Sequence, residues 1–107
     1  MKSLQEKVLQ IVKNIPPGKV TTYGYIARAA GMQNGARMVG WILNRQKFNY
    51  TVPAHRVVNQ QGILTGKMHF ETPELMETLL KSEGVEIKND RVVNFEKHLW
   101  IPPYDHL

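Results

Sequence analysis

The chain has no cysteine, no long apolar run and no grouping of metal ligands. Without cysteine it has no disulfide, no thiolate ligand and no cysteine nucleophile, which is typical of a cytoplasmic protein without a structural zinc. No apolar stretch approaches the ~18 residues that a membrane-spanning helix needs, and the N-terminus does not resemble a signal peptide, so no membrane association is expected. The four histidines form no His-x-x-x-His pair, so neither a metal nor a cofactor is predicted.

The charge that is present is mostly positive. The 107 residues carry a formal net charge of +5, with a pI near 9.6. For so short a chain this balance favours a polyanionic partner such as nucleic acid, although many basic domains bind nothing acidic. The length predicts one domain, residues 1–107, with a modest core. The sequence offers no linker, repeat or clear dimerisation element, and we expect a monomer.

Helical spacing of apolar residues predicts four helices, two of them in the N-terminal part. The first covers about residues 4–15, and the Pro-Pro-Gly sequence at 16–18 ends it. The second begins after Thr22, whose side chain suits an N-cap, and Gly31 ends it.

The other two helices lie further along the chain. One covers about residues 35–45 and forms a helix-turn-helix with the helix before it. The last begins near Pro73 and ends at Gly84. Eight apolar side chains of these two helices are expected in the core: Met38, Val39, Ile42, Leu43, Leu75, Met76, Leu79 and Leu80.

Two short hairpins are predicted in the rest of the chain. Residues 57–58 and 63–64 flank an Asn-Gln-Gln-Gly turn, and residues 85–87 and 91–93 flank an Asn-Asp pair as a weaker hairpin. Combined with the helices, these hairpins indicate an α+β class that is mainly α. The predicted fold is a winged-helix DNA-binding domain with a helix-turn-helix and small β hairpins.

The most specific motif is the hexapeptide Pro-Ala-His-Arg-Val-Val at residues 53–58. It resembles the active-site signature of the O6-alkylguanine-DNA alkyltransferases, in which a cysteine stands between the proline and the histidine. Residues 17–24, 36–40 and 82–85 resemble further segments of that family, in the expected order. The joint pattern is similar to that of the alkyltransferase-like proteins, which keep the lesion-binding domain and lack the nucleophile.

This resemblance implies a site without chemistry. Alkyl transfer needs a thiolate activated by a neighbouring base, and Ala54 occupies the position of the nucleophile. His55 and Glu83 match the family's general base and the carboxylate that orients it. A base acts only on a nucleophile within hydrogen-bond reach, so we interpret this pair as vestigial and structural, and predict no catalytic residue.

Five residues are predicted to bind DNA. In the family the recognition helix lies in the minor groove, and the arginine that matches Arg37 is inserted where the damaged nucleotide was. The tyrosine that matches Tyr23 helps to rotate that nucleotide and hydrogen-bonds the extruded guanine. The full predicted set is Thr22, Tyr23, Ala36, Arg37 and Gly40.

A second set is predicted to surround the flipped base. Main-chain carbonyls at positions 54 and 57 match the groups that the family uses for the guanine amino group, and residues 65–70 lie where the family closes a lid. Met68 and Phe70 are candidates for an apolar wall beside the alkyl group. The predicted lesion pocket is Tyr23, Pro53, Ala54, Val57, Thr65, Gly66 and Lys67.

The predicted function is recognition of DNA damage without catalysis. The protein would bind and flip O6-alkylguanine in double-stranded DNA, shield it from alkyltransferases and flag it for nucleotide excision repair, whose proteins are possible partners. Two alternatives stay open. One is an enzyme that uses His55 or Glu83 directly and passes the alkyl group to protein or water; the other is a winged-helix transcriptional regulator that reads an operator.

Overall fold

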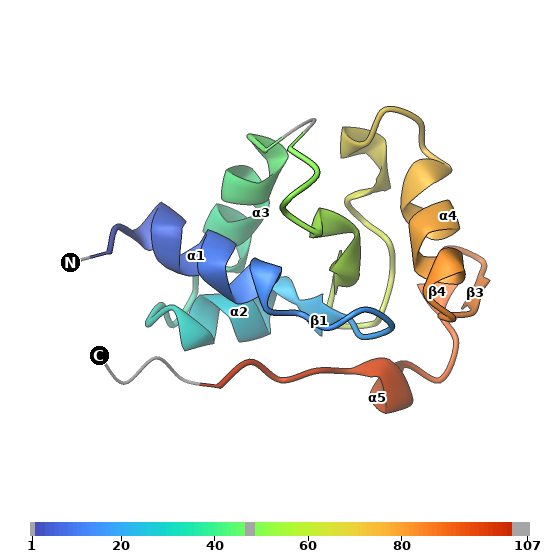
Figure 1. Ribbon diagram of the computed structural model, residues 1–107. Coiled ribbons are helices and arrows are strands. Elements are labelled where there is room, and N and C mark those ends of the chain that lie inside the picture. Colours follow the sequence, from blue (N-terminus) through green and yellow to red (C-terminus); the bar gives the residue numbers. More distant parts are fainter. Residues whose placement is uncertain (1, 47–48, 104–107) are drawn as a thin grey trace.

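The computed structural model of the chain describes residues 2–46 and 49–103. Short helices dominate it, and the strands form two pairs, which confirms the mainly helical α+β class. No helix within these two ranges combines the length and the apolar character that a bilayer crossing requires. The elements in chain order are α1 (Leu4–Lys13), β1 (Thr21–Thr22), α2 (Tyr23–Ala29), α3 (Ala36–Asn44), the 3₁₀ turn η1 (Ala54–Arg56), β2 (Val57–Val58), the 3₁₀ turn η2 (Lys67–His69), α4 (Leu75–Ser82), β3 (Ile87–Lys88), β4 (Arg91–Val92) and α5 (Phe95–His98) (Figure 1).

Helix α1 begins with a capping box. The hydroxyl of Ser3 accepts a hydrogen bond from the Glu6 amide at 3.1 Å, and the Glu6 carboxylate accepts one from the Ser3 amide at 3.3 Å. Val8 and Val12 lie one turn apart on the same face and are fully buried. The helix therefore forms and ends where the sequence predicts, and its apolar face packs on α2 and α3.

Helices α2 and α3 form the predicted helix-turn-helix. The Thr22 side chain caps the N-terminus of α2 by accepting a hydrogen bond from the Tyr25 amide at 3.1 Å. Gly31, just beyond the C-terminal cap, has a φ of +91°, the left-handed conformation that ends a helix. One expectation for α3 is wrong, because the Met38 side chain is 44% exposed. Met38 lies about 100° around the helix from Val39, outside the narrow stripe that packs on α2.

The hairpin predicted for residues 57–64 is also wrong. Strand β2 pairs in parallel with β1, with Thr21 opposite Val57 and Thr22 opposite Val58. All four residues of this strand pair are buried. Packing in the core, and not the turn that follows, therefore determines which strand β2 pairs with. The turn itself does form, because the Asn59 side chain accepts hydrogen bonds from the amides of Gln61 and Ile63 at 2.9 and 2.8 Å. Beyond it the chain diverges from β2 and bridges to β4.

The second predicted hairpin is confirmed. Ile87 pairs with Val92 and Lys88 with Arg91 in antiparallel register. Asn89 and Asp90 connect the strands with φ of 54° and 60°, the left-handed conformation that a tight hairpin turn requires and that Asn and Asp tolerate.

The interior consists of two apolar clusters. One lies among α1, α2 and α3, and the other lies between α4 and the β3–β4 hairpin. The C-terminal segment connects the two halves, because it runs from α5 back beneath β1 toward α1 (Figure 1). Val20 and Leu99 form a parallel bridge there, and Trp100 packs against the first cluster.

Candidate lesion pocket and DNA-binding face

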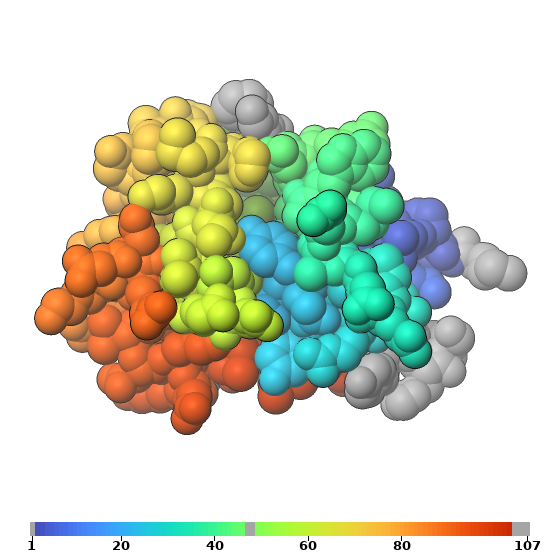
Figure 2. Space-filling view, turned by 180° about the vertical axis from the view of Figure 1, so that it is seen from behind, coloured from blue at the N-terminus to red at the C-terminus, as the bar shows by residue number. Residues whose placement is uncertain are grey.

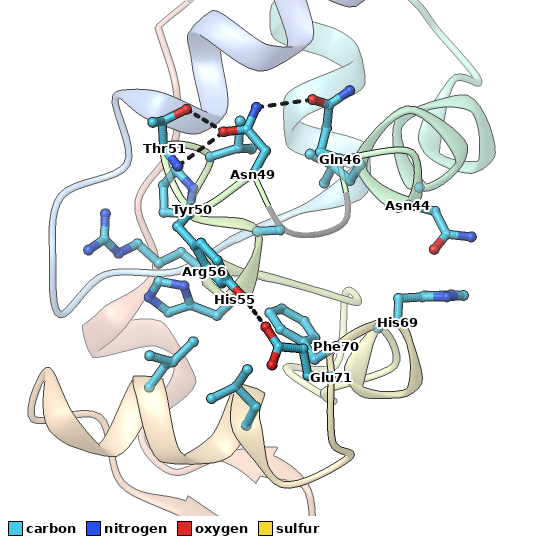
Figure 3. A pocket seen from close by; sticks show the side chains of 18 of the residues that line it. Asn44, Gln46, Asn49, Tyr50, Thr51, His55, Arg56, His69, Phe70 and Glu71 are labelled. Carbon is cyan, nitrogen blue, oxygen red and sulfur yellow. Dashed lines mark hydrogen bonds between the residues drawn. The ribbon is translucent and has the colours of Figure 1, made fainter.

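A cavity of about 590 Å³ opens between the helix-turn-helix and the C-terminal half of the molecule. Helix α3 and residues 49–53 form one side, residues 69–71 and α4 form the other, and η1 lies between them (Figure 3). The space-filling view shows the surface hollowed between green α3 and the yellow segment that follows residue 65 (Figure 2). This volume is typical of small-molecule pockets and exceeds the needs of a single base.

Tyr23, the first residue of α2, lines this cavity. A Cβ atom added at Gly40 would lie 3.7 Å from its ring, and one added at Gly66 would lie 2.9 Å from its hydroxyl. The ring is therefore held between α3 and the 65–70 segment. Burial raises the pKa of the Tyr23 phenol, and a hydrogen bond with Thr65 opposes this only in part. The phenol thus stays protonated and can donate a hydrogen bond to a ligand.

Ala54 and Pro53 lie in the cavity wall at the start of η1. Two short-range hydrogen bonds fix this turn, from the Ala54 amide to the Val52 carbonyl at 2.8 Å and from the Arg56 amide to the Pro53 carbonyl at 3.0 Å. Ala54 is half-buried, and its methyl group supplies neither a nucleophile nor a hydrogen-bond donor.

Glu83 connects three separate segments behind that wall. His55 Nε2 lies 2.8 Å from Glu83 Oε2, and Arg56 donates to the same carboxylate from Nε at 3.0 Å and from Nη2 at 2.7 Å. The Gly18 amide donates to it at 3.2 Å, and Arg56 Nη1 donates to the Ile15 carbonyl at 2.9 Å. The turn after α1, η1 and the end of α4 are thus held together, as the structural interpretation of His55 and Glu83 requires.

Protonation in this network is fixed by burial and by charge. Burial alone would raise the pKa of Glu83, but hydrogen bonds from Arg56, His55 and the Gly18 amide lower it to about 2. Burial lowers the pKa of His55, with Arg56 adding to the effect and Glu83 opposing it. At neutral pH a neutral imidazole therefore donates from Nε2 to an ionised carboxylate.

The predicted DNA contacts fall in different places. Ala36 and Arg37 are exposed on the first turn of α3, and Gly40 is half-buried beside the Tyr23 ring. Thr22 is only 5% exposed, and its side chain is engaged in capping α2. The structure therefore brings Arg37, Ala36 and Gly40 together on one helix and places Tyr23 inside the adjacent cavity.

Four of the seven predicted pocket residues line the cavity: Tyr23, Pro53, Ala54 and Gly66. Val57 does not, because it lies in β2 opposite Thr21, and neither its main-chain carbonyl nor its buried side chain is part of the cavity wall. Lys67 does not either, because its ammonium group is paired with Asp90 Oδ2 at 2.5 Å. Thr65 lies outside the wall, although its side chain acts to lower the pKa of the Tyr23 phenol within it.

The apolar wall is only partly as expected. Phe70 lines the cavity, whereas Met68 is 67% exposed and lies outside it. Leu75 and Leu79 were predicted as core residues, but they face the cavity one helical turn apart. Their helical spacing was correctly recognised, but it marks a cavity wall instead of the core. A further part of the wall was not predicted. It comprises the end of α3 and the residues after it: Leu43, Asn44, Gln46, Asn49, Tyr50, Thr51 and Val52.

Charge is divided sharply along the chain. No acidic residue occurs between Glu6 and Glu71, whereas ten of the 14 lysines and arginines lie in residues 2–70. This part includes the helix-turn-helix, η1 and the segment that closes the cavity. The half of the molecule that holds the predicted DNA-binding residues therefore has a strong positive charge.

Comparison with known sequences agrees with this arrangement. Residues 3–85 match the family described as "6-O-methylguanine DNA methyltransferase, DNA binding domain". The chain belongs to this family. The matched range includes α1 to α4, η1 and Glu83, and so covers the cavity wall and the hydrogen-bond network.

Two curated relatives have names without an enzyme activity. The DNA base-flipping protein of Escherichia coli is 39% identical over 102 residues, which cover 92% of this chain and 74% of the relative. Alkyltransferase-like protein 1 of Schizosaccharomyces pombe is 35% identical over 106 residues, 95% of this chain and 98% of the relative. A methylated-DNA–protein-cysteine methyltransferase of Methanosarcina acetivorans is 40% identical over 80 residues, 75% of this chain and 50% of that enzyme.

A solved structure has the same fold. The crystal structure of S. pombe Atl1 in complex with damaged DNA containing O6-carboxymethylguanine aligns with a TM-score of 0.82 at 36% identity. The alignment covers 95% of this chain and 100% of that one. The resemblance to alkyltransferase-like proteins inferred from residues 53–58 is thereby confirmed.

Proposed function

We propose that this protein binds double-stranded DNA that contains O6-alkylguanine, receives the flipped base in the cavity and leaves the alkyl group in place. One observation carries the proposal: Ala54 lies in the wall of a cavity that also contains Tyr23, within the family fold of a DNA methyltransferase. The 107 residues include no cysteine that could replace it. Binding without transfer is the function that such a site supports best.

Each part of the site has a role in this proposal. Arg37, exposed at the start of α3, would occupy the space that the extruded nucleotide leaves in the stack. Tyr23, protonated and fixed between Gly40 and Gly66, would hydrogen-bond the flipped base. Flipping costs a few kcal/mol, and it costs least for a damaged, poorly paired base, so the lesion supplies part of the selectivity.

A bound but unrepaired lesion has two consequences for repair. The O6 group would be enclosed in the cavity, and alkyltransferases would be excluded from it. The persistent complex would then mark the site for nucleotide excision repair. Family membership and the relatives named for base flipping and for likeness to alkyltransferases support the binding step from which both consequences would follow.

The absence of chemistry is tested by mass spectrometry. After incubation with an O6-methylguanine duplex, we expect the protein mass and the lesion to be unchanged, even at long times. A competition assay with an active alkyltransferase should show slower repair of the same duplex as this protein is added. A methyl adduct on the protein, or restored guanine, would overturn the proposal in favour of an enzyme.

A further inference from the structure

Trp41 on α3 and Arg45, the residue that caps the C-terminus of this helix, form an exposed cation–π pair. The guanidinium carbon of Arg45 lies 4.7 Å from the centre of the Trp41 ring, and Trp41 is 56% exposed. Tryptophan, methionine and arginine are enriched where proteins bind partners, and Met38 is exposed on the same helix, so the pair indicates a contact surface. Neither residue lines the cavity, so the pair is not part of the candidate lesion pocket.

The surroundings of the pair favour an anionic partner. Among the described residues no carboxylate is paired with Arg45, and no acidic residue occurs from position 7 to position 70. A guanidinium held over an aromatic ring can still donate from its N–H groups, and their fork geometry matches a phosphate. Met38, also exposed on α3, adds apolar area to the same outer surface.

The spacing of Arg37, Trp41 and Arg45 indicates which part of a DNA duplex the pair would contact. Arg37 and Arg45 are eight residues apart, which is about 12 Å along a helix axis, and Trp41 lies midway. The minor groove is only about 6 Å wide. If Arg37 enters the groove at the start of α3 and the helix axis runs across the groove, Arg45 lies beyond the groove wall, at the level of a sugar–phosphate backbone.

We propose that Trp41 and Arg45 form a second DNA contact, on the backbone beside the groove that Arg37 enters. Arg45 binds a phosphate, and Trp41 holds the guanidinium in place and packs against the adjacent sugar. This inference rests on the proposed function, because it places the DNA on α3. It adds that affinity for any duplex, damaged or not, depends on this pair, whereas discrimination of the lesion does not.

Tryptophan exposure gives a direct test. The chain has two tryptophans, so protein labelled with 5-fluorotryptophan should give two fluorine signals, and Trp41→Phe assigns them. The H₂O/D₂O isotope shift of each signal reports its exposure. In complexes with undamaged and with O6-methylguanine duplexes, the Trp41 shift should fall while the half-buried Trp100 serves as an internal control. A Trp41 shift that is unchanged in both complexes overturns the proposal and leaves the surface to a protein partner.

Charge removal gives an independent test. We expect Arg45→Gln to weaken binding of both duplexes by about fivefold at low salt, since an exposed ion pair is lost. Its log–log salt slope should be less negative by about 0.9. Lys97→Gln, on α5 and remote from α3 in both views, removes the same charge and should leave the slope unchanged (Figures 1 and 2). Equal slopes for Arg45→Gln and wild type overturn the phosphate contact.

The two proposals fail in different ways. If wild-type protein binds both duplexes equally while Trp41 is protected, the proposed lesion recognition fails and the backbone contact stands. If the wild type prefers the lesion while Trp41 stays exposed and Arg45→Gln binds normally, only the backbone contact fails.

Discussion

The imidazole of His55 lies with Nε2 2.8 Å from Oε2 of Glu83, in a chain that has no thiol for this pair to activate. The same carboxylate accepts two further donors from Arg56 and one from the Gly18 amide. A residue held by this many partners from two other segments is a structural junction. In a cysteine-containing relative the His55–Glu83 hydrogen bond would serve catalysis. In this protein it helps to hold the cavity wall in place.

Removal of the Glu83 charge should therefore destabilise the fold. In Glu83→Gln, Arg56 keeps its partly buried charge without a counter-ion, and we expect a loss of about 3 kcal/mol in the free energy of unfolding. Urea titration at pH 7 measures this loss. Glu77→Gln, which removes a surface ion pair with Lys81, is the matched control and should cost well under 1 kcal/mol.

Stability should also fall as the pH falls. The pKa of Glu83 is about 2 in the folded protein and about 4.5 when unperturbed, so its stabilisation is complete above pH 4.5 and is lost between pH 4.5 and 2. The pKa of His55 is lowered on folding, so its contribution is also lost on acidification, beginning below about pH 6.5. The urea midpoint of wild type should decline through both ranges, and Glu83→Gln should lack the decline below pH 4.5. Parallel curves for the two proteins would contradict the assignment.

Arg37→Ala and Tyr23→Phe should lower the preference for damaged over undamaged DNA. Each change removes a group that acts mainly after flipping, so we expect specific binding to lose about 1–3 kcal/mol more than non-specific binding. Tyr25→Phe is a matched control, because Tyr25 stacks on Arg28 and does not line the cavity. An equal loss on both duplexes for Arg37→Ala would show that Arg37 contacts only phosphate.

Gly66→Ala should have an effect like that of Tyr23→Phe. The added methyl group would lie 2.9 Å from the Tyr23 hydroxyl and must displace it. Backbone strain does not contribute, because the φ of Gly66 is −86°. Gly24→Ala, whose methyl group would make an ordinary 3.8 Å contact with Thr22, is the control. Duplex titrations of both variants check this prediction, which is wrong if Gly66→Ala discriminates the lesion like wild type.

The cavity should accept O6 groups larger than methyl. It has a volume of about 590 Å³, and Phe70, Leu75 and Leu79 supply an apolar wall. Each additional methylene that is fully desolvated would contribute about 0.8 kcal/mol. Across duplexes with O6-methyl, ethyl, propyl and benzyl groups, measured at one salt concentration, affinity should rise or hold. A steep fall beyond methyl would mean that the 65–70 segment closes the space beside Ala54.

Local features of the fold were predictable from the sequence, because they depend on neighbouring residues. The Pro-Pro-Gly sequence at 16–18, the cap at Thr22 and the left-handed Gly31 each fix a helix end within a few residues. The Asn89-Asp90 turn specifies its hairpin in the same way. The position of Ala54 in a cavity wall was predictable from the motif at 53–58, because a resemblance to a family carries information about tertiary contacts. A local pattern of residues does not carry that information.

Contacts between distant segments were not predictable in this way. Two valines at 57–58 have the same β propensity whether they pair with residues 63–64 or with β1, and burial against both clusters decides for β1. Lys67 was expected to face the lesion, but Asp90, 23 positions later, holds its ammonium group elsewhere. The part of the wall formed by residues 49–52 has no periodicity or motif, so only the folded chain reveals it.

A binding titration with paired duplexes tests the central claim most directly. Two duplexes of identical sequence, one with O6-methylguanine at a single position and one with guanine there, are titrated with the protein at one salt concentration. We expect at least about tenfold tighter binding to the damaged duplex, with the lesion recovered intact, because a poorly paired base is extruded at lower cost. Equal affinity for the two duplexes would contradict it.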